Sequence, residues 1–195
     1  MVCCESTSKE KYLEKVTVGK LKQHDAEIIL HEYDANWPAL FEREAKRICG
    51  VLGDTVLQIE HIGSTSVQGL CAKPVIDILL AVADSSAEST YVPQLEMAGY
   101  ILRIREPDWF QHRLFKGPDT DINLHVFSQG VAEIERMICF RNWLRSHDGD
   151  RELYANTKRE LARQKWEYIQ YYADAKTAVV REIMERVLLN ELEGF

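Results

Sequence analysis

A short run of small polar residues, Gly63-Ser64-Thr65-Ser66, follows an apolar strand-like segment and could hold an anion. Glycine lets the backbone approach an anion closely, and the hydroxyl and free backbone N–H groups can donate hydrogen bonds to phosphate oxygens. An ordinary cap or turn is the alternative interpretation. The chain contains neither a Walker A loop nor a GxSxG elbow, which argues against a P-loop ATPase and a serine hydrolase.

An acidic residue, Asp77, interrupts the apolar run from Val75 to Val82, which is typical of a strand covered on both faces. Burying an ionised carboxylate is costly unless the group is paired or binds a metal, so we expect Asp77 to contact a metal ion or a substrate. An internal ion pair or a strand end open to water is the alternative. Lys73, just before Pro74, could reach a phosphate as a point charge, or it could be a solvated loop charge.

A third group of polar residues lies on the strand-like segment 121–127, where strand alternation places Asn123 and His125 on one face. Neutral imidazole is a good metal ligand or general base, so His125, His61 and Asp77 could form a small cluster. A structural histidine is the alternative. Four basic side chains lie on the neighbouring expected strands: Arg103, Arg105, Arg113 and Lys116. They could neutralise phosphates or simply decorate an exposed sheet.

These residues belong to an expected α/β half that is followed by a helical half. Apolar spacing predicts a helix from Pro38 that Gly53 closes. Strands are expected at 27–33, 55–62, 75–82, 100–105, 113–116 and 121–127, with a short helix at 89–98. After Gly130 the spacing becomes helical and predicts three helices, at 134–144, 153–168 and 180–192.

Three regions follow from this pattern. Residues 1–26 are polar and weakly periodic, which predicts a flexible N-terminal extension or a loosely attached helix. Residues 27–130 form the expected α/β core. Residues 131–195 form the expected C-terminal helical segment, packed on that core.

Composition narrows the class of protein. With 195 residues and 46% hydrophobic content, the chain is long enough for one core with a helical appendage. The net charge of −7 argues against nonspecific binding of DNA or RNA, which needs clustered Lys and Arg, but is compatible with a small anionic ligand. No stretch approaches the roughly 20 apolar residues of a membrane span, no secretory signal is visible, and the five cysteines form no CxxC pair. We therefore expect a cytoplasmic protein that binds neither nucleic acid nor membrane.

The chain resembles the GrpB family, also called UPF0157, within the nucleotidyltransferase superfamily. The resemblance runs from about Ile28 to Leu188. It is carried, in chain order, by Tyr33–Pro38, His61–Leu70, Ala72–Ile78, Leu124–Phe127 and Phe140–Arg145, and by Tyr154, Lys158, Leu161, Ala162 and Lys176.

This resemblance implies an α/β fold with a nucleotidyltransferase-like mixed sheet flanked by helices and joined to a C-terminal helical segment. In the superfamily pattern, a Gly-Ser turn and two acids separated by one residue on the next strand hold Mg²⁺ and a nucleotide triphosphate. Gly63 and Ser64 match the turn and Asp77 matches the first acid, but Leu79 stands at the second acid position. A second metal ligand would have to come from elsewhere, and His125 or His61 is the expected one; a histidine ligand favours Mn²⁺ or Zn²⁺ relative to Mg²⁺.

Three functions are compatible with these residues. The first is metal-dependent transfer of a nucleotidyl group from an NTP to a small acceptor, with Asp77, His125 and His61 as both catalytic residues and metal ligands. Its expected phosphate contacts are Gly63, Ser64, Thr65, Ser66, Lys73, Arg113 and Asn123. The second is a non-catalytic module that binds a nucleotide or phosphorylated metabolite, which the missing second acid favours. The third is a metal-dependent phosphoesterase.

Overall fold

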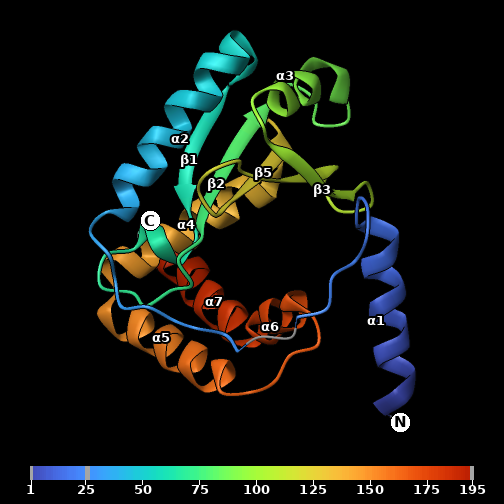
Figure 1. The fold of residues 1–195 in the computed structure, drawn as a ribbon. Coiled ribbons are helices and arrows are strands. Elements are labelled where there is room, and N and C mark those ends of the chain that lie inside the picture. Colours follow the sequence, from blue (N-terminus) through green and yellow to red (C-terminus); the bar gives the residue numbers. More distant parts are fainter. Residues whose placement is uncertain (1, 25–26, 194–195) are drawn as a thin grey trace.

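The computed structural model of the protein, which describes residues 2–24 and 27–193, is built around a five-stranded mixed β-sheet (Figure 1). The strands are β1 (Gln58–Ile62), β2 (Ile76–Val82), β3 (Ile101–Glu106), β4 (His112–Lys116) and β5 (Ile122–Ser128). They are ordered β1-β2-β5-β4-β3, with β2 and β5 parallel and the other neighbouring pairs antiparallel. The apolar strand β2 therefore lies inside the sheet, as its composition predicts.

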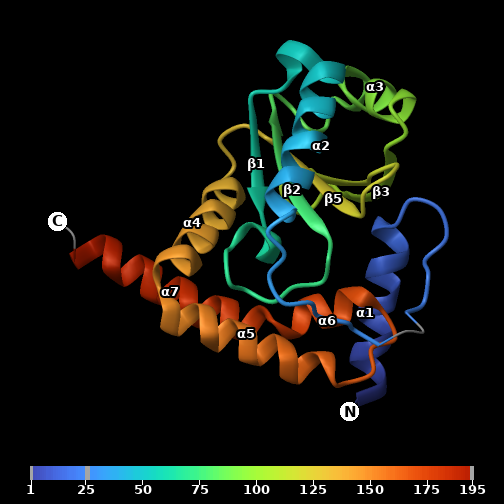
Figure 2. The same ribbon diagram turned by 60° about the vertical axis from the view of Figure 1, so that its left-hand side comes forward.

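Helices cover both faces of the sheet (Figures 1 and 2). Helices α2 (Trp37–Leu52) and α3 (Val92–Met97) pack on the face that carries the largest apolar cluster, which includes Ile78 and Leu80. Helix α4 (Ala132–Ser146) packs on the other face, over a smaller cluster that includes Leu79 and Phe127. Because side chains alternate along β2, Asp77 faces the side of α4.

The C-terminal helices lie across one end of the sheet (Figure 2). They are α5 (Asp148–Ala162), α6 (Ile169–Ala175) and α7 (Thr177–Glu193). A third apolar cluster joins α5 and α7 to the segment between β1 and β2 through Val67, Leu70, Tyr154 and Ile183. Helix α6, which lies between α5 and α7 in the chain, contacts both of these helices.

The helical half differs from expectation in one respect, since the helix expected at 153–168 is broken. Helix α5 ends at Ala162 and α6 starts at Ile169. The Nε1–H of Trp166 donates to the Leu161 carbonyl (2.8 Å) and so satisfies an acceptor at the end of α5. The expected fold class, a mixed sheet flanked by helices with a C-terminal helical segment, is confirmed. The boundary expected at residue 130 lies between β5 and α4.

The N-terminal region forms helix α1 (Val2–Val16), which lies beside β3 (Figure 1). Leu13 and Val16 are buried, and the backbone N–H of Val18 donates to the Arg103 carbonyl (2.8 Å). Residues 1, 25 and 26 of the expected extension lie outside the described residues. Among the helices of the described chain, none is both long and apolar enough to cross a membrane.

The strand expected at residues 27–33 does not form. The segment makes a single antiparallel bridge, between His31 and Ala72. Ile28 is buried but Ile29 is 65% exposed. The segment therefore lies over the loop before β2 and does not form an edge strand of the sheet.

Candidate functional site

Asp77, near the start of β2, is the centre of the candidate site. Parallel pairing with β5 sets Asp77 beside Asn123, and His125 lies on the same face two residues on. The Nδ2–H of Asn123 donates to Asp77 Oδ1 (2.7 Å), and His125 Nε2 lies 3.7 Å from the same oxygen. Burial raises the pKa of Asp77, but His125, the hydrogen bond from Asn123 and the charge of Lys176 together hold that pKa below its usual value. Asp77 is therefore an ionised carboxylate, and its side chain is 27% exposed.

The turn after β1 passes directly against Asp77. Gly63 has φ of +69°, and a Cβ at this position would lie 2.8 Å from the Cβ and 2.9 Å from the Cγ of Asp77. Any other residue would be strained in backbone conformation and would collide with the carboxylate side chain. The absence of a side chain at Gly63 therefore allows the turn to contact the Asp77 side chain.

The three residues after Gly63 form a single 3₁₀ turn, Ser64–Ser66. Thr65 Oγ1 donates to the Val75 carbonyl (3.3 Å), and Ser66 Oγ donates to the Gly63 carbonyl (2.6 Å). Both side chains are buried, so their hydroxyls hold the turn in shape. Ser64 is half-buried and faces the neighbouring helix α5.

Three lysine amino groups lie near one another at the turn and Asp77. They come from the loop before β2 (Lys73), from α5 (Lys158) and from the residue after α6 (Lys176). The Nζ of Lys158 donates to Ser64 Oγ (3.1 Å) and to the Cys71 carbonyl. Burial lowers the pKa of Lys158 to about 7, and burial together with the charge of Lys176 lowers the pKa of Lys73 to about 8. Burial also lowers the pKa of Lys176. Within the described chain none of the three forms a salt bridge with a carboxylate.

An aromatic ring, Tyr172 of α6, lies next to two of these lysines. The Nζ atoms of Lys73 and Lys176 are 5.4 Å and 4.8 Å from its centroid, which is within the range of a cation–π contact. Tyr172 is 1% exposed, and its hydroxyl has no hydrogen-bond partner among the described residues. A buried hydroxyl without a partner costs about 1–3 kcal/mol. It therefore marks a position where a polar group of a ligand would be stabilising.

His61 and Arg113, two of the expected site residues, are directed away from Asp77. His61 pairs with Ile78, so its ring lies on the opposite face of the sheet, where it stacks on Phe41 with 4.8 Å between centroids. Burial lowers the pKa of His61 to about 4. Arg113 is 5% exposed and donates from Nε to Glu88 Oε1 (2.6 Å). The structure thus places Asn123 and His125 beside Asp77, whereas strand alternation turns His61 and Arg113 to the other face. His61 still contacts the turn, because its Nε2 lies 3.0 Å from Thr65 Oγ1.

The donor set around Asp77 does not fit a divalent metal. Leu79, at the second acid position, is fully buried, and His61 points away. Throughout the described residues, no group of three or more His, Cys, Asp and Glu side chains is placed to hold a metal ion. Lysine ammonium groups near Asp77 repel a cation and attract an anion.

Lys158, Lys176 and Tyr172 were not expected as site residues, although the first two carry part of the family resemblance. The signal for Lys158 is its position on α5, four residues after the buried Tyr154, which places a lysine on an apolar helix stripe. Lys176 and Tyr172 have no comparable sequence signal, because only tertiary packing brings Lys176 near Asp77 and sets the Tyr172 ring beside Lys73 and Lys176.

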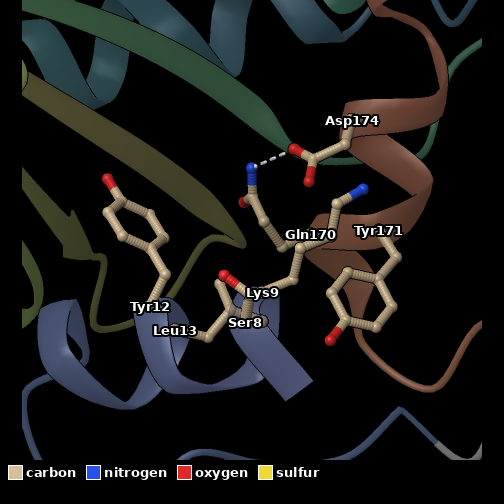
Figure 3. Close-up of a pocket in the computed structure, with 7 residues that line it drawn as sticks. All are labelled: Ser8, Lys9, Tyr12, Leu13, Gln170, Tyr171 and Asp174. Atoms are coloured by element: carbon tan, nitrogen blue, oxygen red, sulfur yellow. Dashed lines mark hydrogen bonds between the residues drawn. The ribbon is translucent and has the colours of Figure 1, made fainter. Parts of the chain in front are cut away.

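A separate pocket lies between α1 and α6 (Figure 3). Its lining residues are Ser8, Lys9, Tyr12, Leu13, Gln170, Tyr171 and Asp174. The Nε2–H of Gln170 donates to Asp174 Oδ1 (2.9 Å), and Lys9 Nζ lies 6.0 Å from the centroid of the Tyr171 ring. The pocket carries charges of both signs and shares no lining residue with the group around Asp77.

Residues 27–186, which include the sheet and most of the C-terminal helices, match the GrpB protein family. The chain therefore belongs to the GrpB family, and the resemblance seen in its motifs is confirmed. It is 64% identical over 177 residues to a UPF0157 protein of Halalkalibacterium halodurans, covering 91% of each chain. A UPF0157 protein of Streptomyces coelicolor is 46% identical over 160 residues, covering 82% of this chain and 84% of that protein. The crystal structure of conserved protein GrpB from Enterococcus faecalis aligns with a TM-score of 0.73 at 31% identity, covering 84% of this chain and 99% of that one.

Proposed function

We propose that the site around Asp77 binds a small molecule that carries phosphate, such as a nucleotide. The observation that carries this proposal is a group of three lysines: Lys73 and Lys176 near Asp77, and Lys158 on Ser64 of the turn. None of the three forms a salt bridge with a carboxylate in the described chain. When protonated, these groups leave an excess of positive charge. A phosphate group carries a charge of about −2 near pH 7 and would balance that excess.

The surrounding groups suit the oxygens of a phosphate. Gly63 is exposed and has no side chain to block the approach. Ser64 supplies a hydroxyl beside Lys158, and Tyr172 supplies the buried hydroxyl that lacks a partner. Charge-assisted hydrogen bonds of this kind are shorter and stronger than neutral ones.

Isothermal titration of ATP and of pyrophosphate into the full-length protein, with EDTA present, tests this proposal. Lys73→Met and Lys176→Met each remove a charge while keeping most of the apolar stem, and each is expected to weaken binding about tenfold or more. Lys46→Met is the matched control, because Lys46 is exposed on α2. Binding that is absent, or that all three variants retain equally, would rule out the lysine site.

Transfer of a nucleotidyl group from an NTP to a small acceptor is the second candidate. The contact between Gly63 and Asp77 favours it, because it brings together the turn and the first acid of the superfamily pattern. The test is release of pyrophosphate from NTPs with a panel of small acceptors, in the presence of EDTA or of Mg²⁺, Mn²⁺ or Zn²⁺. Release that Asp77→Asn abolishes would support transfer. Binding without turnover would leave the protein as a binding module, and release of inorganic phosphate alone would indicate a phosphoesterase.

A further inference from the structure

A row of four polar side chains crosses the sheet on the face of Asp77, with one residue on each of four adjacent strands. The row runs from Glu106 on β3 through His112 on β4 and His125 on β5 to Asp77 on β2. Glu106 Oε2 lies 2.7 Å from His112 Nδ1, and His112 Nε2 lies 3.1 Å from His125 Nδ1. The row ends where His125 Nε2 lies 3.7 Å from Asp77 Oδ1.

The outer end of the row fixes the direction of its hydrogen bonds. Burial raises the pKa of Glu106, but hydrogen bonds from His112 and Tyr12 hold that pKa below its usual value, so Glu106 is a carboxylate that can only accept. His112 Nδ1 must therefore donate to it. Burial lowers the pKa of His112 to about 4, which leaves this ring neutral, with a lone pair on Nε2. That lone pair accepts a hydrogen bond from His125 Nδ1–H.

Packing holds the middle of the row in place. His112 is 3% exposed, and its ring lies against Phe127 (4.8 Å between centroids) and Trp109 (5.1 Å). Tyr12 of α1 donates to Glu106 Oε1 (2.7 Å) and covers the outer end. Exposure rises toward the other end, where the side chain of His125 is 19% exposed. The row is therefore anchored at Glu106 and accessible at Asp77.

This order determines what His125 presents to Asp77. Its Nδ1 carries the proton that His112 accepts, and its Nε2 lies 3.7 Å from Asp77 Oδ1, which is too long for a direct hydrogen bond. A hydroxyl group in this position can donate to either atom, and it can also accept from Nε2 when that nitrogen is protonated.

We propose that Glu106 and His112 are positioning residues that hold His125 Nε2 toward Asp77. His125 Nε2 and Asp77 Oδ1 then bind a hydroxyl group of the phosphate-bearing ligand. The part of this inference that concerns the ligand rests on the proposed function. The part that concerns His125 rests on the hydrogen bonds of the row and on the burial of His112, and not on the ligand, so the two can fail separately.

Nitrogen NMR of the full-length protein labelled at histidine tests the positioning. The expected result is a His125 ring with a proton on Nδ1, and loss of this preference in His112→Phe, which keeps an aromatic ring against Phe127 but removes the acceptor. A neutral His125 with its proton on Nε2 alone would overturn the proposal. This measurement uses the unaltered protein, so it remains possible even if His112→Phe does not fold.

A pair of matched ligands, glycerol 1-phosphate and propyl phosphate, tests the hydroxyl contact by isothermal titration. The expected result is about tenfold tighter binding of glycerol 1-phosphate, because a hydrogen bond to a charged group is lost in propyl phosphate. His112→Phe should reduce this ratio to below threefold while leaving the affinity for propyl phosphate within twofold. Equal binding of both ligands would overturn the hydroxyl contact and leave the phosphate site standing, whereas binding of neither would contradict the phosphate site.

Discussion

Replacing Gly63 with alanine should be unusually costly, because this position combines a positive φ with a close approach to Asp77. With φ of +69° and ψ of −175°, the backbone lies in a region that residues with a Cβ rarely adopt, which alone costs about 1–3 kcal/mol. The new methyl group would also lie 2.8 Å from the Cβ of Asp77, and forcing such a contact costs a further ~1–3 kcal/mol. The free energy of unfolding should therefore fall by about 2–6 kcal/mol.

Gly130 provides a control for the cost of a positive φ without a close contact. Its φ is +80°, and a Cβ there would meet nothing within 4 Å. Gly130→Ala should therefore cost only the conformational penalty of about 1–2 kcal/mol. Urea unfolding of both variants measures the difference. If Gly63→Ala is no more destabilising than Gly130→Ala, the contact between the turn and Asp77 is not as close as the structure has it.

Three further predictions concern the stability of the ligand-free protein. Burial holds the pKa of Lys158 at about 7 in the folded protein, whereas a lysine titrates near 10.5 when unfolded, so the unfolded chain binds more protons between these values. Lys158 should therefore contribute a rise in stability with pH in this window of at most about 1.4 kcal/mol per unit. Unfolding measured across this window should show a smaller rise in Lys158→Met, and an equal rise would contradict the assignment. Tyr172→Phe removes a buried hydroxyl that has no partner and should leave the melting temperature unchanged or higher; a loss of more than about 1 kcal/mol would show that the hydroxyl is satisfied. Arg141→Met removes hydrogen bonds to Glu60 Oε2 (2.7 Å) and to the His61 carbonyl (2.9 Å) and should cost about 2–4 kcal/mol, part of which Glu60→Gln should restore in the double variant; no recovery would argue against the ion pair.

The elements that position the site could largely be predicted from local sequence. The apolar run of β2 and the helical spacing of α2, closed by Gly53, reflect short-range rules of alternation and capping, and both elements form as expected. The prediction of a strand at residues 27–33 was wrong. Isoleucines such as Ile28 and Ile29 occur in any extended segment, and a strand forms only where the segment pairs with a neighbour. The break between α5 and α6 likewise involves a contact that local sequence does not predict, the hydrogen bond from Trp166 Nε1–H to the Leu161 carbonyl.

The candidate site could be predicted only in part. The turn, Asp77, Asn123 and His125 lie on adjacent strands, so alternation brings them together. The same alternation places the His61 side chain on the opposite face of the sheet from Asp77. In the antiparallel pairing of β1 with β2, His61 lies opposite Ile78 and not opposite Asp77. This register cannot be read from either strand alone. Lys176 and Tyr172 are about 100 residues from Asp77 in the chain. Only tertiary packing brings Lys176 near Asp77 and the Tyr172 ring beside Lys176.

The most direct test of the central claim is the proton balance of phosphate binding. Anion binding favours the ammonium form of the lysines and so should raise the pKa of Lys73 and of Lys158, which are about 8 and about 7 in the free protein. Isothermal titration of ATP at pH 8, with EDTA and in buffers of different ionisation enthalpy, should therefore show net uptake of protons, and the affinity should fall between pH 7.5 and 9.5. Binding that requires a divalent metal, or that takes up no protons and is independent of pH in this window, would contradict the account.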